Sequence, residues 1–394
     1  MPVYNNEPVI VSHISEYDPG KITGIIRSQF DALGINGDSF ENKRVVIKPN
    51  LIMKKSPEYA ATSSPEILDA VLTILDGYSP ASVVIAESSG GPYTKQSLEA
   101  AYNVCGIKKV TDKHNATLNF DTTYKVLDFP EGKTVKSFNI ITPVAEADIV
   151  ISLPRLKTHS LTGMSGAVKN YFGVIPGLEK FELHARFPDY NDFSSMLVDL
   201  ATLVATRTET INILDAIVGM EGNGPTGGSP RRIGAILTSR SAFKIDSIAK
   251  ELICTRGVLS VKEAEERGLA SADAEKINVI GDDYKPLIVK DFKQPDSKKR
   301  GLVGFLQTFS GGAIGEYFRP RPVIGKSCIG CGECVRSCPE ETISLVSAGS
   351  KKVASIKLDS CIRCFCCQEL CPIHAIEVKR RGIISFINRA KKED

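Results

Sequence analysis

The sequence lacks the features that would place it at once with nucleic-acid, membrane or secreted proteins. Its 49 lysines and arginines are nearly matched by 46 aspartates and glutamates, so the formal net charge is only +3. That balance argues against a nucleic-acid partner and against a polybasic membrane binder. No run of 18 apolar residues occurs, so we expect no transmembrane segment. Residues 1–17 have neither a basic start nor an apolar stretch, so we expect no secretory signal and a cytoplasmic location.

Cysteine is scarce in most of the chain and crowded in a small part of it. Of the 11 cysteines in 394 residues, only Cys105 and Cys254 precede position 328, and the others lie within 328–371. An odd number of cysteines without an export signal favours thiolate ligands over disulfides. We therefore predict four segments, which are a body (1–300), a connector (301–325), a cysteine-rich domain (326–380) and a basic tail (381–394).

The cysteine-rich domain repeats internally. SCIGCGECVRSCP at 327–339 and SCIRCFCCQELCP at 360–372 both follow the spacing C-x2-C-x2-C-x3-C-P. This is the spacing of bacterial two-cluster ferredoxins, in which the fourth cysteine of each run binds the other cluster. Zinc sites instead use isolated C-x2-C pairs. The spacing predicts one 4Fe–4S cluster on Cys328, Cys331, Cys334 and Cys371, and a second on Cys361, Cys364, Cys367 and Cys338. Cys366 falls outside the spacing, and we interpret it as a non-ligand.

Across residues 326–378 this domain resembles the two-cluster bacterial ferredoxins, which implies a small α+β domain that carries single electrons. The partner would be a redox protein or a small-molecule substrate. The sequence leaves the oligomeric state open.

The body alternates strand and helix patterns, which predicts an α/β fold with a mainly parallel sheet. Short apolar, β-branched runs are typical of strands buried on both faces. Such runs occupy Arg44–Ile47, Ser82–Ala86, Asp148–Leu153 and Ile211–Leu214. Helices are predicted at 65–75, 192–207 and 242–254, the first of them capped by Ser64.

Polar side chains follow each of these strand runs. Lys48 and Asn50 follow the first, Glu87 the second, Lys157 the third and Asp215 the fourth. The carboxyl ends of parallel strands face a shared crevice, so we expect these five residues to bind substrate or another, unknown ligand there. The alternative is ordinary polar loop composition.

Several segments of the body carry a family resemblance. IKPN at 47–50, AESSGG at 86–91, LPRLKTH at 153–159, GAVKNYFGVIPG at 166–177 and LDAIVGMEGNGP at 214–225 resemble the domain of unknown function 362 family. The resemblance covers about residues 40–280. It implies an α/β body that is often joined to a ferredoxin module, and it brings no established reaction.

A more distant similarity links His159, Lys169 and His184 to the nickel-pincer lactate racemase family. That similarity implies His159 as a proton-transfer residue, Lys169 as a tether or substrate lysine, and His184 as a metal or substrate ligand. The first strand end, Lys48-Pro49-Asn50, departs from the racemase pattern, and racemization needs no iron–sulfur clusters. Both histidines could instead be hydrogen-bonded structural residues.

These patterns together favour an iron–sulfur redox protein whose clusters exchange single electrons with a reaction in the crevice of the body, as a ferredoxin-linked oxidoreductase would. One alternative is a non-catalytic electron carrier or adaptor whose body docks a partner enzyme. A second alternative is a pincer-type racemase or isomerase.

Overall fold

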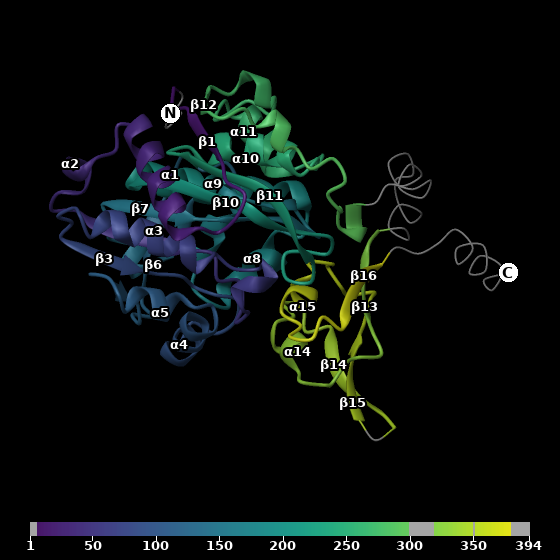
Figure 1. Cartoon of the computed structure of the whole chain (residues 1–394). Helices are drawn as coiled ribbons and strands as arrows, with labels where there is room; N and C mark the ends of the chain where they lie inside the picture. Colours follow the sequence, from purple (N-terminus) through teal and green to yellow (C-terminus); the bar gives the residue numbers. More distant parts are fainter. Residues whose placement is uncertain (1–5, 299–318, 350, 380–394) are drawn as a thin grey trace.

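The computed structural model describes residues 6–298, 319–349 and 351–379, and it consists of an α/β body with a small domain at one side (Figure 1). The predicted basic tail 381–394 and the first part of the predicted connector lie outside these residues. No helix within them is long and apolar enough to cross a membrane.

The body is built on a ten-stranded sheet in the order β12-β1-β11-β10-β7-β2-β3-β4, with β8 beside β10 and β9 beside β8. The central strands β10, β7, β2, β3 and β4 are parallel neighbours, whereas β11 runs antiparallel to β1 and β10. The mainly parallel α/β body predicted from the sequence is thereby confirmed. The strands are β1 Val9–His13, β2 Arg44–Pro49, β3 Ser82–Ile85, β4 Thr117–Leu118, β7 Ile149–Leu153, β8 Arg155–His159, β9 Gly163–Ser165, β10 Glu209–Glu221, β11 Ser229–Ser239 and β12 Val279–Gly281; β5 Tyr124–Asp128 and β6 Ser137–Ile141 form a separate hairpin.

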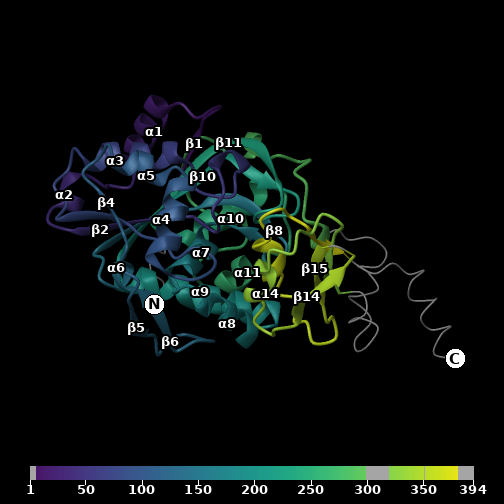
Figure 2. The ribbon, with the colours of Figure 1, turned by 90° about the horizontal axis from the view of Figure 1, so that it is seen from below.

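Helices cover both faces of this sheet (Figure 2). Alternate residues of one strand point to opposite faces, so Val45 and Ile47 belong to one hydrophobic core and Val46 to the other. The first core includes side chains of α1, α3, α4 and α5, and the second includes side chains of α7, α9, α10 and α11. The helices of the body are α1 Pro19–Ala32, α2 Gly37–Phe40, α3 Pro65–Leu75, α4 Lys95–Val104, α5 Ile107–Thr111, α6 Thr142–Ala145, α7 Ala167–Asn170, α8 Glu179–Arg186, α9 Tyr190–Arg207, α10 Ala242–Leu252 and α11 Leu259–Glu266.

The predicted helices and strands of the body are present, with two differences that bear on function. The Ser64 hydroxyl caps α3 by accepting a hydrogen bond from the backbone N–H of Ile67. However, β10 continues to Glu221 instead of ending at Leu214, because it is paired along most of that length with β11. The segment after β7 is not a loop but a further strand, β8, which pairs with β10 and β9.

The small domain contains β13 Arg321–Ile324, α14 Glu333–Arg336, β14 Ile343–Ala348, β15 Lys351–Ile356, α15 Cys366–Glu369 and β16 Ile376–Lys379. β13 pairs with β16 and β14 with β15, both antiparallel. The predicted small α+β ferredoxin-like domain is confirmed. β13 lies within the predicted connector (301–325), yet it completes a sheet of this domain. Figure 1 shows α15 on the side that faces the body and the β14–β15 hairpin pointing away from it.

Candidate functional site

The small domain is held against the body by polar contacts around α15. The Thr226 hydroxyl donates to the carbonyl oxygen of Glu369 at 2.8 Å, and Gln368 Nε2 donates to the carbonyl oxygen of Asn223 at 3.1 Å. Lys55 Nζ lies 2.6 Å from His374 Nε2. The contacts come from the turn between β10 and β11 and from the loop after β2. They place α15 over the polar edge of the sheet.

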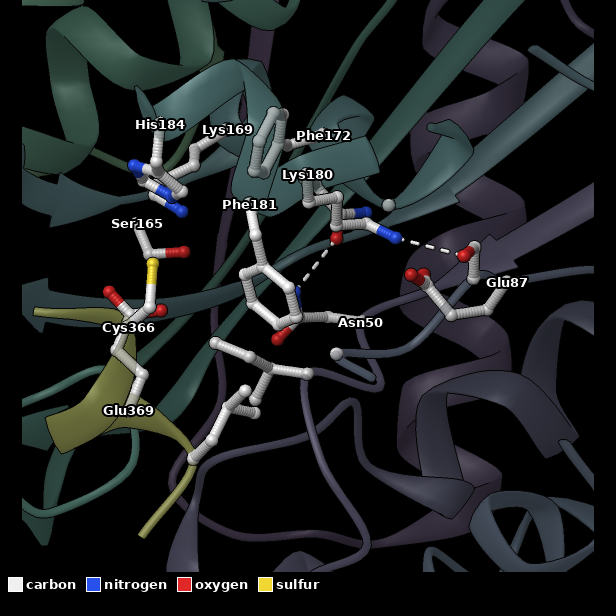
Figure 3. A pocket seen from close by; sticks show the side chains of 16 residues that line it. Asn50, Glu87, Ser165, Lys169, Phe172, Lys180, Phe181, His184, Cys366 and Glu369 are labelled. Atoms are coloured by element: carbon white, nitrogen blue, oxygen red, sulfur yellow. Dashed lines mark hydrogen bonds between the residues drawn. The ribbon is translucent and has the colours of Figure 1, made fainter. Parts of the chain in front are cut away.

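A cavity of about 70 Å³ lies between α15 and the body. The body contributes the residues after β2 and β3 and the segment from β9 to α8, and the small domain contributes α15 and the residue after it (Figure 3). The lining residues are Asn50, Ile52, Glu87, Ser88, Gly90, Ser165, Lys169, Asn170, Phe172, Gly173, Lys180, Phe181, His184, Cys366, Glu369 and Leu370. We call this space the interface cavity.

A closed polar network forms the floor of the interface cavity. Lys48 and Glu87 are both buried and form an ion pair. Lys48 Nζ also donates to the Pro49 carbonyl at 2.8 Å and to Asn170 Oδ1 at 3.3 Å, while Asn170 Nδ2 donates to the Ser152 hydroxyl at 2.9 Å. Burial lowers the pKa of Lys48 and raises the pKa of Glu87, and their mutual contact opposes both shifts.

Two more buried lysines, Lys157 and Lys180, lie beside this network and donate hydrogen bonds to uncharged groups. Lys157 Nζ donates to Asn50 Oδ1 and to the Ala61 carbonyl, and Lys180 Nζ donates to the Ser88 hydroxyl at 2.8 Å and to the Ile175 carbonyl at 2.6 Å. Burial lowers the pKa of each to about 7, and Lys169 contributes to the shift of Lys157. Near neutral pH these amines can therefore change protonation state within the site.

His159 joins the body to the small domain. Its Nδ1 accepts backbone N–H bonds from Leu161 at 3.1 Å and Thr162 at 3.4 Å, so the neutral ring carries its proton on Nε2. Nε2 lies 3.2 Å from Glu369 Oε1, in an orientation outside hydrogen-bond geometry, so the contact is electrostatic. Burial lowers the pKa of His159 to about 4. Burial would raise the pKa of Glu369, but the His159 ring, when it is protonated, and the charge of Lys169 lower it to about 2.

Ser165, Lys169 and His184 lie together on one side of the cavity, facing Cys366 and Glu369 (Figure 3). Lys169 Nζ lies 5.4 Å from the centre of the Phe172 ring. The His184 ring stacks on Phe193 with 4.3 Å between centroids, and burial lowers its pKa to about 3. The three side chains that the racemase similarity singled out therefore converge on α15, with His159 reaching it through Glu369.

Asp215 does not lie with the other predicted substrate-binding residues. Because β10 continues past Leu214, Asp215 sits inside the sheet, where Oδ2 lies 3.7 Å from Arg155 Nε and both carboxylate oxygens accept from the Tyr17 hydroxyl at 2.9 Å. It does not line the interface cavity. Of the other four, Asn50 and Glu87 line the cavity, and Lys48 and Lys157 lie behind them, in contact with Glu87 and Asn50 respectively.

The small domain contains two further cavities, each lined by one of the predicted ligand sets. Cys328, Cys331, Cys334 and Cys371 line the first, and Cys338, Cys361, Cys364 and Cys367 line the second. Backbone N–H groups donate to three of these sulfurs, from Ala354 to Cys328 and from Thr342 to Cys338 at 3.4 Å, and from Ala375 to Cys371 at 3.2 Å. Such donors suit anionic, cluster-bound thiolates. We call the first space the outer cluster cavity and the second the inner cluster cavity.

Comparison with known proteins assigns both parts of the chain. Residues 45–251 match the family described as domain of unknown function (DUF362), and residues 327–375 match the 4Fe-4S dicluster domain. This chain belongs to the DUF362 family. Its C-terminal domain is a ferredoxin-like iron–sulfur domain.

Relatives of this DUF362 chain match it to different extents. The thylakoid-associated protein sll1697 of Synechocystis is 28% identical over 291 residues, covering 71% of this chain and 85% of the relative. A ferredoxin of Methanothermococcus thermolithotrophicus is 41% identical over 49 residues, covering 12% of this chain and 77% of the relative. The solved lactate racemase apoprotein from Thermoanaerobacterium thermosaccharolyticum gives a TM-score of 0.33 at 15% identity, covering 53% of this chain and 51% of that one. The cytoplasmic location expected from the sequence stays a prediction.

Sequence reasoning missed several residues of the interface cavity in this DUF362 protein. Ser165, Asn170 and Lys180 follow none of the predicted strand runs. Glu369 lies in the x3 gap between two predicted cluster ligands, and a carboxylate in that gap was a usable signal. Cys366, predicted to be a non-ligand, lines both the interface cavity and the inner cluster cavity.

Proposed function

We propose that this protein is an iron–sulfur oxidoreductase that exchanges single electrons between its ferredoxin-like domain and a small molecule bound in the interface cavity. One observation carries the proposal, which is that Cys366 forms part of the wall of both the interface cavity and the inner cluster cavity. A molecule in the interface cavity would therefore be one side chain away from the ligands of a cluster.

The thiolates that would hold the clusters are those predicted from the spacing. Cys328, Cys331, Cys334 and Cys371 would hold one in the outer cavity, and Cys338, Cys361, Cys364 and Cys367 would hold the other in the inner cavity. When bound, 4Fe–4S clusters supply one-electron oxidation and reduction. The ferredoxin-like domain thus gives the protein its redox chemistry, and the body gives it a binding site.

The two cluster cavities differ in exposure, which suggests where electrons enter or leave. The outer cavity is lined by the exposed side chains of Ile329, Cys331 and Ile373. The inner cavity includes Phe365, Cys366 and Cys367, which are buried. We propose that a redox partner protein docks at the outer cavity and that the inner one serves the interface cavity.

The residues of the body would bind and orient the small molecule. Lys157 and Lys180, with pKa values of about 7, can hold or release a proton close to it. The contact of His159 with Glu369 fixes α15 relative to β8. Because proton transfer often accompanies electron transfer to organic molecules, buried amines next to the cavity suit a reductive reaction.

The ligand assignment is tested by iron and sulfide analysis of anaerobically reconstituted full-length variants. We expect Cys367→Ser to lose about half of the bound iron, because Cys367 belongs to one of two ligand sets. Cys366→Ser is the matched control one residue away and should keep the wild-type iron content. Equal losses in both variants would contradict the assignment.

The redox role of the interface cavity is tested on protein purified anaerobically in two portions, one of them reduced with dithionite. Small molecules released from each portion are identified by mass spectrometry. A near-stoichiometric molecule whose oxidation state follows that of the protein, and which is lost in Lys169→Met, supports the proposal. Protein with full clusters and no such molecule contradicts it and favours an electron carrier whose body only docks a partner enzyme.

A further inference from the structure

Four polar side chains that line the interface cavity have no hydrogen-bond partner among the described residues. One is the carboxylate of Glu369, an acceptor that lies 3.2 Å from His159 Nε2. The other three, which can donate, are the Ser165 hydroxyl, the Lys169 ammonium group and the ring nitrogens of His184. Ser165 is 6% exposed and His184 4% exposed, so bulk water has little access to either, whereas Lys169 is partly exposed. Buried polar groups are nearly always hydrogen-bonded, because an unsatisfied one costs about 1–3 kcal/mol. We call these three side chains the open triad.

The charges around the cavity do not balance. Lys169 and Lys180 line the cavity and Lys48 and Lys157 lie behind it, but Lys157 and Lys180, with pKa values of about 7, are only partly charged near neutral pH. Glu87 and Glu369 are the carboxylates that line the cavity. Glu87 is paired with Lys48, whereas Glu369 contacts His159 and interacts with the charge of Lys169 without forming an ion pair with it. Lys169 makes no ion pair within the described residues. The site therefore has room for additional negative charge next to the open triad.

We propose that the open triad binds one small oxyanion, the carboxylate or phosphate group of the molecule in the interface cavity. This inference rests on the function proposed above and names the chemistry of its ligand. Lys169 would supply the positive charge, and the Ser165 hydroxyl and an N–H of His184 would donate hydrogen bonds to the anion oxygens. Charge-assisted hydrogen bonds of this kind are shorter and stronger than neutral ones.

The surroundings of His184 hold the ring ready for this role. Its face stacks on Phe193 at an interplanar angle of 14°, and the ring meets Phe172 edge to face with 5.6 Å between centroids. Burial keeps His184 neutral by lowering its pKa to about 3, so the ring acts as a hydrogen-bond donor and not as a second cation. Burial lowers the pKa of Lys169, and Glu369 opposes that shift. With Lys169 protonated, the open triad carries a single positive charge, which balances one carboxylate fully and a phosphate group, with a charge of about −1.5 to −2, in part.

The size and the opposite wall of the cavity limit the rest of the ligand. A volume of about 70 Å³ corresponds to roughly five water positions at about 10–15 Å³ each. That space suits a compact molecule of a few heavy atoms and is too small for a nucleotide. Ile52, Phe181 and Leu370 also line the cavity and offer apolar contacts. The ligand class is accordingly a small organic acid or a small phosphate ester.

The proposal is tested by calorimetric titration of the reconstituted full-length protein with acetate, inorganic phosphate and acetamide, the neutral isostere of acetate. We expect acetate or phosphate to bind and acetamide not to bind. Competition between acetate and phosphate would show that they share one site, and the tighter of the two identifies the group. Equal binding of acetate and acetamide would overturn the proposal.

Substitutions in the open triad test whether the anion binds there. We expect Lys169→Met to weaken anion binding at least about 10-fold and Ser165→Ala about 5-fold, the range for a charged and a neutral hydrogen bond. Lys169→Arg should retain binding, and Lys108→Met on the surface of α5 controls for the loss of one charge. Wild-type affinity in both triad variants would overturn the proposal.

A second measurement separates the open triad from a purely electrostatic role toward the clusters. Lys169 could serve only to balance the negative charge of a cluster in the inner cavity. Lys169→Met would then lower the reduction potential and leave anion binding unchanged, and that result overturns the proposal. The test is also independent of the proposed redox role. Anion binding without any redox change of the bound molecule contradicts the redox role alone, whereas a neutral redox-active ligand contradicts the oxyanion site alone.

Discussion

The floor of the interface cavity, formed by the network around Lys48, and one of its walls, formed by the open triad, both contain polar side chains. They differ in whether those side chains have hydrogen-bond partners within the protein. On the floor, Lys48, Glu87 and Asn170 satisfy one another. On the wall, Ser165, Lys169 and His184 have no hydrogen-bond partners among the described residues. A lysine at this cavity is thus structural where its partner is part of the protein, as for the fully buried Lys48, and available for binding where that partner is missing, as for the partly exposed Lys169.

The largest effect expected from this difference is on stability, in Lys48→Met. Removing Lys48 leaves the carboxylate of Glu87 buried without its counter-ion, which typically costs about 3–5 kcal/mol. We expect a loss of this size in the free energy of unfolding, measured by anaerobic urea unfolding with far-UV circular dichroism. The double variant Lys48→Met/Glu87→Gln should recover part of the loss. A loss below about 1 kcal/mol would show that the floor is not a closed network.

The second effect concerns the glycine that leaves room for this pair. A Cβ on Gly173 would lie 2.0 Å from Glu87 Oε1 and 2.6 Å from Lys48 Nζ. Gly173→Ala should therefore separate the ion pair and cost about 1–3 kcal/mol, as overpacking does. Gly24→Ala is the control, since Gly24 lies on α1 with no atom within 4 Å of the added Cβ, and it should raise stability by about 0.5–1 kcal/mol. Equal changes in the two variants would contradict the packing argument.

The sequence predicts the position of a site residue where that position depends on residues close to it in the chain. The cluster ligands follow a spacing within two short segments, and each predicted set lines its own cavity. Lys48 and Glu87 were expected to meet because each lies at the end of one of two neighbouring parallel strands, and they do. Asp215 does not lie with them, because pairing with β11 extends β10 beyond its apolar run, and its role in binding stays a prediction.

Only part of the open triad could be predicted from the sequence. Lys169 and His184 were identified by similarity to a family, whereas Ser165 was not, because the path of the chain from β9 to α8 has no periodic pattern that fixes it. Glu369 and Cys366 reach the cavity only because the small domain docks through α15. Docking between domains depends on surfaces from distant parts of the chain, so it could not be deduced from local sequence.

The third prediction concerns Lys180, a buried lysine with hydrogen-bond partners, and its contribution to the pH dependence of stability. The pKa of Lys180 in the folded protein is about 7, below the ordinary lysine pKa of 10.5. Between these values the unfolded chain binds more protons than the folded one, so this group makes stability rise as pH rises from about 7 toward 10. The slope is about 1.4 kcal/mol per pH unit for one group. Lys180→Met should be less pH-dependent by about this amount, measured by urea unfolding at pH 7, 8 and 9. Parallel curves for wild type and variant would contradict the shift.

The smallest expected change in the free energy of unfolding is that of Lys169→Met. It distinguishes the open triad from the closed network around Lys48. Lys169→Met removes a cation that forms no ion pair among the described residues. The variant weakens the electrostatic stabilisation of Glu369 but does not take a contacting counter-ion from a carboxylate, as Lys48→Met does. The variant loses the contact of Lys169 with the Phe172 ring, worth about 0.5–1 kcal/mol at exposed sites. It also no longer pays for burying a charge. We expect the free energy of unfolding in ligand-free protein to stay within about 1 kcal/mol of wild type. A loss as large as that of Lys48→Met would mean that Lys169 belongs to the closed network, and the open triad would then have to be abandoned.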